Sequence, residues 1–121
     1  MSRILLVDDD NDMLQLTGRW LTKAGYEVTT ATSGEEALDI LSGDKPDLIL
    51  LDVIMPGMDG PATFEAIRRR DELADIPIYF RTGKDEWDML PLLSRLRPDG
   101  VVSKAEGKTE LLKAVGQALQ P

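Results

Sequence analysis

The sequence contains neither cysteine nor histidine among its 121 residues. Without cysteine it can form neither disulfide bonds nor thiolate zinc sites. Without histidine it lacks the usual general base, the Ser-His catalytic triads and the commonest metal ligand. Any bound metal must therefore be held by oxygen atoms, which favours Mg²⁺, Mn²⁺ or Ca²⁺.

Long apolar runs and an excess of positive charge are also missing. No apolar stretch approaches the roughly 20 residues of a membrane span, and the N-terminus does not resemble a signal peptide, so we expect a cytoplasmic protein. The net charge of -8 argues against direct binding to nucleic acid or anionic membrane. With 42% hydrophobic residues, residues 1–121 are expected to form one domain with its own core.

Apolar runs alternate with amphipathic stretches along the whole chain. We expect strands at residues 3–7, 26–31, 48–52, 76–82 and 101–102. Helices are expected at residues 12–24, 33–42 and 61–70, around Trp87, Leu90 and Leu93, and around Leu111, Leu112, Val115 and Leu119. Because alternating strands and helices build parallel sheets covered on both faces, the predicted fold class is α/β, a doubly wound (βα)₅ sheet.

Several residues predict where these elements begin and end. Gly25 is a helix stop, and Ser33 with Glu36 forms a capping box for the second helix. Proline is tolerated only in the first turn of a helix, so Pro91 predicts that the fourth helix begins late, near Asp88. The second strand alternates Thr and Val with polar residues, which is typical of an edge strand.

Five polar residues each close a predicted strand. Asp8 and Asp9 follow one apolar run, Asp52 ends another, and Thr82 and Lys104 end two more. The carboxyl ends of parallel strands meet at one edge of the sheet, where ligand sites lie in such folds. Three carboxylates repel one another unless a cation lies between them, so this edge is predicted to bind metal. A lysine beside them lowers the repulsion and can bind phosphate.

The acidic run from Asp8 to Asp12 has other interpretations. It could be a solvated turn in which Asp10 or Asp12 caps a helix, because Asp is a good N-cap residue. A calcium loop would need Gly at its sixth position and Glu at its twelfth, where this chain has Met13 and Arg19, so that interpretation is rejected. Taken alone, Lys104 is a surface lysine and Thr82 an ordinary strand residue.

Taken together, these residues resemble the receiver domain of two-component response regulators. The matching segments are Leu6-Val7-Asp8-Asp9, Leu51-Asp52-Val53-Ile54-Met55-Pro56-Gly57-Met58-Asp59-Gly60, Thr82-Gly83 and Gly100-Val101-Val102-Ser103-Lys104. They occur in the family's order and spacing over essentially the whole chain. The resemblance implies a flavodoxin-like sheet with strand order 2-1-3-4-5 and a phosphorylation-dependent signalling switch rather than an enzyme, with only intrinsic autophosphorylation and autodephosphorylation.

The resemblance also implies a role for each matched residue. Asp52 would accept a phosphoryl group from a histidine on a sensor kinase or phosphotransfer protein, with Thr82 and Lys104 binding that group. Mg²⁺, with Mn²⁺ as the alternative, would be bound by Asp9 directly, by Asp8 largely through water, by Asp52 and by the backbone carbonyl of Ile54. Because an anionic carboxylate must attack an anionic phosphoryl group, charge neutralisation and alignment are the main catalytic tasks.

Output would pass through protein contact with a downstream target, on the face formed by the fourth and fifth helices and the last strand, without direct DNA binding. Two positions depart from the family: Val101 replaces the usual Tyr or Phe, and Ala105 replaces the proline that normally follows the lysine. Val is stiff at χ1 and has no ring to swing, so we expect phosphorylation to change the loop of residues 83–88 instead.

Two other functions compete with the switch. In an Mg²⁺-dependent phosphatase, Asp8 and Asp10 would be nucleophile and acid, but such enzymes usually need a cap insertion that this chain lacks. A receiver-like domain that binds a partner without phosphate usually lacks an acid or the lysine, and this chain has both.

Overall fold

The computed structural model describes residues 2–120, except for the side chains of Lys84, Asp85 and Trp87. Its centre is a parallel five-stranded sheet with the order β2-β1-β3-β4-β5. The strands are β1 (Arg3–Val7), β2 (Glu27–Ala31), β3 (Leu48–Asp52), β4 (Ile78–Thr82) and β5 (Gly100–Ser103). The predicted fold class and strand order are therefore confirmed, including the edge position of β2.

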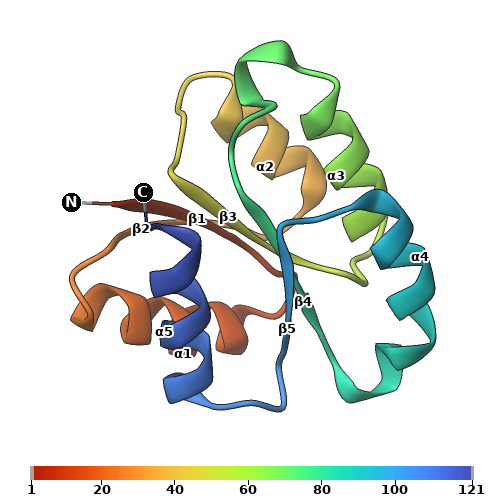
Figure 1. Cartoon of the computed structure of the whole chain (residues 1–121). Helices are drawn as coiled ribbons and strands as arrows, with labels where there is room; N and C mark the ends of the chain where they lie inside the picture. Colours follow the sequence, from red (N-terminus) through yellow and green to blue (C-terminus); the bar gives the residue numbers. More distant parts are fainter. Residues whose placement is uncertain (1, 121) are drawn as a thin grey trace.

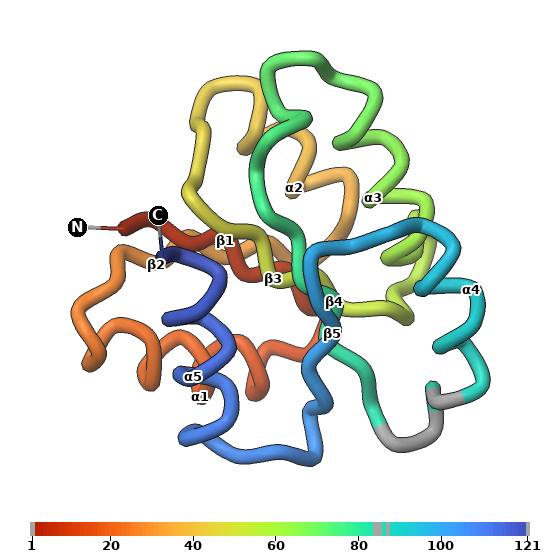
Figure 2. The backbone as a smooth tube through the Cα atoms, in the orientation of Figure 1, coloured from red at the N-terminus to blue at the C-terminus, as the bar shows by residue number. Residues whose placement is uncertain are grey.

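Helices cover both faces of the sheet, as Figure 1 shows. They are α1 (Asn11–Lys23), α2 (Gly34–Leu41), α3 (Gly60–Arg68), α4 (Leu90–Leu96) and α5 (Lys108–Ala118), with 3₁₀ helices η1 (Asp71–Leu73) and η2 (Lys84–Met89). Helices α1 and α5 lie on one face, and α2, α3 and α4 lie on the other. Figure 2 traces the backbone from each strand into the helix that follows it. No described helix is long and apolar enough to cross a membrane.

The helix caps and the turn that the sequence predicts are present in the structure. Asp10 caps α1 by accepting from the backbone N–H groups of Asp12 and Met13. Ser33 caps α2, and the Glu36 carboxylate reaches back to accept from the N–H of Thr32 at 2.9 Å. The chain turns at Gly25 with a φ of 101°, a backbone conformation that favours glycine.

Some boundaries differ from the prediction. Strand β4 begins at Ile78 rather than at residue 76, because Pro77 has no N–H to donate to a sheet ladder. Helix α3 ends at Arg68 rather than at residue 70. The fourth helix begins at Leu90, after the 3₁₀ helix η2, with Pro91 in its first turn. The Trp87 side chain, predicted to mark this helix, lies outside the described residues.

Side chains on the central strands alternate between two buried clusters. Leu5, Val7, Ile49, Leu51, Ile78 and Phe80 pack toward α2, α3 and α4, whereas Ile4, Leu6, Leu48, Leu50 and Val102 pack toward α1 and α5. Alternate residues of a strand share a face, so Asp8, Asp52, Arg81 and Lys104 continue the second series at the carboxyl edge. The same repeat that builds the core thus places four charged groups on one side of the sheet.

Gly60 shows how tightly the chain packs beneath this edge. A Cβ atom added there would lie 2.3 Å from the Asp52 carbonyl oxygen and 2.8 Å from the Val53 Cα. The Gly60 N–H donates to the Val53 carbonyl at 2.8 Å. Gly57 of the same loop has a positive φ of 75°, a conformation that favours glycine, whereas Gly60 is needed for close approach.

We expect Gly60→Ala to lower the free energy of unfolding by about 2 kcal/mol, because backbone atoms must move to admit the methyl group. Urea unfolding measures this loss. Gly116→Ala is the matched control: it lies in α5 with nothing within 4 Å of the new Cβ, and should add about 0.5–1 kcal/mol. Equal effects of the two substitutions would contradict the close approach at Gly60.

Candidate functional site

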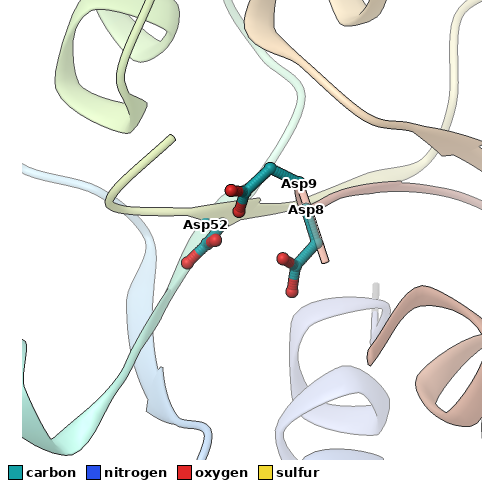
Figure 3. Close-up of side chains that lie close together, drawn as sticks. All are labelled: Asp8, Asp9 and Asp52. Atoms are coloured by element: carbon teal, nitrogen blue, oxygen red, sulfur yellow. The ribbon is translucent and has the colours of Figure 1, made fainter. Parts of the chain in front are cut away.

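Three carboxylates meet where β1 and β3 end, as Figure 3 shows. Asp52 is the last residue of β3, and Asp8 and Asp9 directly follow β1. Each contributes an oxygen atom that lies within 4.8 Å of those of the other two. Asp8 and Asp52 are buried, whereas Asp9 is exposed. The sequence prediction that these acids share one edge of the sheet agrees with this geometry.

Lys104 lies across the two buried carboxylates. Its Nζ is 2.9 Å from Asp52 Oδ1 and 3.1 Å from Asp8 Oδ2. The Lys104 backbone N–H donates to the carbonyl of Thr82 at 2.7 Å, which joins the ends of β4 and β5. Thr82 itself is buried at this edge. All five polar residues that close predicted strands therefore lie at the carboxyl edge of the sheet.

The electrostatics of the site follow from burial and from like charges. Burial, together with the charge of Asp8, raises the pKa of Asp52 from 3.8 to about 7, although Lys104 opposes this shift. Burial alone would lower the pKa of Lys104, but the hydrogen bond and charge of Asp52 outweigh it and raise that pKa. The site is thus short of positive charge, and an added cation would favour the ionised form of Asp52.

The donor set suits a hard divalent cation. All three side chains offer carboxylate oxygens, the ligands that Mg²⁺ and Mn²⁺ prefer. Asp8 Oδ1 accepts from the Asp10 N–H at 3.0 Å, whereas Asp8 Oδ2 is buried without a hydrogen-bond partner among the described groups. The Lys104 ammonium, 3.1 Å away, places one positive charge beside this oxygen. A buried acceptor left in this state fits a site built for a cation.

The other acids of the run have different surroundings. Asp10 Oδ1 accepts from two backbone N–H groups at 3.0 and 3.2 Å, so this carboxylate serves as the helix cap that the sequence offered as an alternative. Asp12 lies exposed in the first turn of α1. Ile54 lies two residues beyond β3 with its side chain exposed. The metal-binding role of its carbonyl stays a prediction.

Sequence reasoning missed one charged residue of the site. Arg81 lies in β4 between Phe80 and Thr82 and is only 2% exposed. Its signal in the sequence is a cation inside an otherwise apolar strand. The charges of both Asp8 and Asp52 act on its guanidinium.

The two positions that depart from the family pattern lie beside the site. Val101 is an exposed residue of β5, and Ala105 is exposed one residue after Lys104. The Ala105 N–H donates to the Ser103 hydroxyl at 3.1 Å.

A doubly wound parallel sheet with an acidic cluster and a lysine at its carboxyl edge defines the class of flavodoxin-like signalling domains. The response regulator receiver domain family matches residues 4–116. The chain belongs to this family, whose members are switches of two-component signalling.

Curated relatives and solved structures agree with this membership. The transcriptional regulatory protein AfsQ1 of Streptomyces coelicolor is 38% identical over 109 residues, which are 89% of this chain and 47% of that protein. Response regulator SaeR of Staphylococcus aureus is 34% identical over 98% of this chain and 51% of its own length. The chain thus spans about half or less of these relatives. The chemotaxis response regulator CheY4 of Vibrio cholerae has a TM-score of 0.91 and 31% identity, with 98% of this chain and 99% of that chain covered.

Proposed function

We propose that residues 1–121 form a single receiver domain that accepts a phosphoryl group on Asp52 in a reaction that requires Mg²⁺. The donor would be a phosphohistidine of a sensor kinase or of a phosphotransfer protein. The observation that carries this proposal is the buried Asp52 carboxylate, held 2.9 Å from the Lys104 ammonium and beside two further carboxylates. A cytoplasmic location belongs to the same proposal.

In the proposed reaction, a carboxylate oxygen of Asp52 forms a bond to phosphorus while the bond from phosphorus to the histidine nitrogen breaks. Mg²⁺ would be held by Asp8, Asp9, Asp52 and the carbonyl of Ile54, and would supply positive charge against the phosphoryl oxygens. Lys104 stabilises the same charge from the side of β5, since its ammonium already lies at Asp52. Thr82, buried at the end of β4, would donate its hydroxyl to the phosphoryl group.

The domain would act as a switch with only its own slow phosphorylation and dephosphorylation activity. The phosphatase alternative is disfavoured because its proposed acid, Asp10, is engaged as the cap of α1. A phosphate-independent receiver is disfavoured because Asp8, Asp9, Asp52 and Lys104 are all present and brought together.

The signal would leave through protein contact on the face formed by α4, β5 and α5. Leu90, Leu92 and Val101 are exposed there, which supports a surface for a protein partner. The net charge of -8 supports the proposal that this domain does not bind DNA directly. A change in the loop of residues 83–88 on phosphorylation stays a prediction. The Gly83 N–H there donates to the Glu86 carboxylate at 2.8 Å.

The proposal is tested by adding a small phosphodonor to the protein with Mg²⁺ or with EDTA. One acid-stable, base-labile phosphate should appear with Mg²⁺ and none with EDTA. Mg²⁺ alone should raise the melting temperature. At a free Mg²⁺ concentration of 100 times its Kd, the free energy of unfolding should rise by about 2.7 kcal/mol. Phosphate on a hydroxyl residue, or an unchanged melting temperature at millimolar Mg²⁺, would contradict the proposal.

The individual ligands can be separated in the same Mg²⁺ titration. Asp9→Ala should weaken Mg²⁺ binding more than Asp8→Ala. The reason is that Asp9 is exposed and free to face the ion, whereas Asp8 already accepts from Asp10 and faces Lys104. The opposite order would show that Asp8 is the direct ligand.

A further inference from the structure

Arg81 places a positive charge inside the core, directly beneath the acidic site. It is 2% exposed, and its strand neighbours in register are Asp52 on β3 and Val102 on β5. In Figure 1, β4 lies between these two strands. A guanidinium removed from water is costly unless charge and hydrogen bonds compensate it.

Hydrogen bonding compensates only part of this cost. Nη1 donates to the Thr17 hydroxyl on α1 at 3.2 Å, whereas Nε has no hydrogen-bond partner among the described groups. No carboxylate of the described side chains forms a direct ion pair with Arg81. One neutral hydroxyl is a weak partner for a fully buried cation.

The compensating charges are on the same side of the sheet. The two-residue repeat of β4 points Arg81 toward α1 and α5, the face to which Asp8 and Asp52 also belong. Burial lowers the pKa of Arg81, and the charges of Asp8 and Asp52 counteract that shift. Arg81 Nε is buried with no hydrogen-bond partner among the described groups. The buried Asp8 Oδ2 belongs to the same face of the sheet and lies 3.1 Å from the Lys104 ammonium.

We propose that Arg81 is a built-in counter-charge of the phosphorylation site, acting on Asp8 and Asp52 from within the core. With Lys104 alone, the three carboxylates would leave two negative charges uncompensated, and with Arg81 they leave one. The consequence is that Arg81 lowers the repulsion among the carboxylates when no divalent ion is bound, and that the site binds such an ion more weakly. For Mg²⁺, this inference rests on the proposed function.

The competing explanation is that Arg81 only anchors α1 to the sheet through Thr17. The two explanations predict different effects of a neutral side chain at position 81 on the affinity for a divalent cation. Removing the charge should raise the affinity for a divalent cation, because the cation then meets two uncompensated charges. Removing only the Thr17 hydroxyl leaves the charge in place and should alter stability without altering that affinity.

Calorimetric titration with Mg²⁺ at fixed ionic strength tests this difference. We expect Arg81→Met to bind Mg²⁺ at least about tenfold more tightly than the wild type, equivalent to about 1.4 kcal/mol. Arg81→Lys, which keeps the charge, and Thr17→Val, which keeps the guanidinium, should stay within about threefold of the wild type. Unchanged or weaker binding by Arg81→Met would overturn the proposal. Arg81→Gln is the second neutral variant if the Met variant does not fold.

A metal-free measurement separates this inference from the proposed function. Urea unfolding in EDTA of Arg81→Met, Asp52→Asn and the double variant gives the coupling between the two side chains. The inference predicts that Arg81→Met destabilises the protein clearly more when Asp52 is present than when Asn replaces it. Additive effects would refute the counter-charge. Clear coupling with no Mg²⁺ binding by any variant would support the counter-charge while refuting the metal-dependent function.

Discussion

Asp52→Asn is expected to abolish phosphoryl incorporation from a small phosphodonor. The amide nitrogen and oxygen of Asn have almost the shape of the carboxylate but lack its negative charge and nucleophilicity. The Asp52 side chain that the substitution replaces is buried, and its Oδ1 lies 2.9 Å from the Lys104 ammonium. Intact-mass measurement after incubation with Mg²⁺ and phosphodonor should show one added phosphoryl group on the wild type and none on the variant.

The folding of the variant supplies the control for this loss. The raised pKa of Asp52 means that the folded protein favours its neutral form. The stabilisation that Asp52 contributes is therefore complete below pH 3.8 and is lost as the pH rises through about 7. Asn stays neutral throughout, so the metal-free variant should lose less stability than the wild type over this pH range. Loss of phosphorylation together with loss of folding would leave the acceptor role unsupported.

Lys104→Met is expected to be among the most destabilising single substitutions at the site. It leaves the buried carboxylates of Asp8 and Asp52 without the ammonium that lies 3.1 and 2.9 Å from them. Removing one partner of a buried ion pair should lower the free energy of unfolding by about 3 kcal/mol in EDTA at pH 8. The loss should be smaller at pH 5, where Asp52 can take up a proton, and Mg²⁺ should restore part of it.

Lys45→Met is the matched control for Lys104→Met. It removes the same charge from an exposed position, so its effect on unfolding should stay within about 0.5 kcal/mol. Urea titrations of both variants, with and without Mg²⁺, measure the difference. Similar losses from the two substitutions would show that the short distances at Lys104 contribute no net stabilisation.

Much of the site was predictable because the carboxyl ends of all the strands of a parallel sheet lie at the same edge. The apolar runs predicted the bounds of β1 and β3 correctly, and the polar residues at their ends marked the carboxyl edge of the sheet. The caps at Asp10 and Ser33 were predictable because each solves a local hydrogen-bonding problem. The sequence alone therefore places Asp8, Asp9, Asp52, Thr82 and Lys104 at one edge of the sheet.

Other features depend on contacts between distant segments, which sequence patterns do not contain. Arg81 stands in a strand predicted to lie inside the sheet, but its burial and its contact with Thr17 appear only when α1 packs against the sheet. Gly60 looks like a flexible loop residue until the backbone of Asp52 is found 2.3 Å from the position of its missing Cβ. Helix α4 begins two residues later than predicted, because the residues before it form a 3₁₀ helix rather than an α-helical turn.

Mapping the phosphorylated residue tests the central claim most directly. The wild-type protein would be phosphorylated with a small phosphodonor and Mg²⁺, treated with borohydride to convert an aspartyl phosphate to homoserine, and digested for peptide sequencing by mass spectrometry. We predict homoserine at position 52 and at no other aspartate. Homoserine at position 8 would point to phosphatase-like chemistry, and a stable phosphate on a serine or threonine would contradict the account.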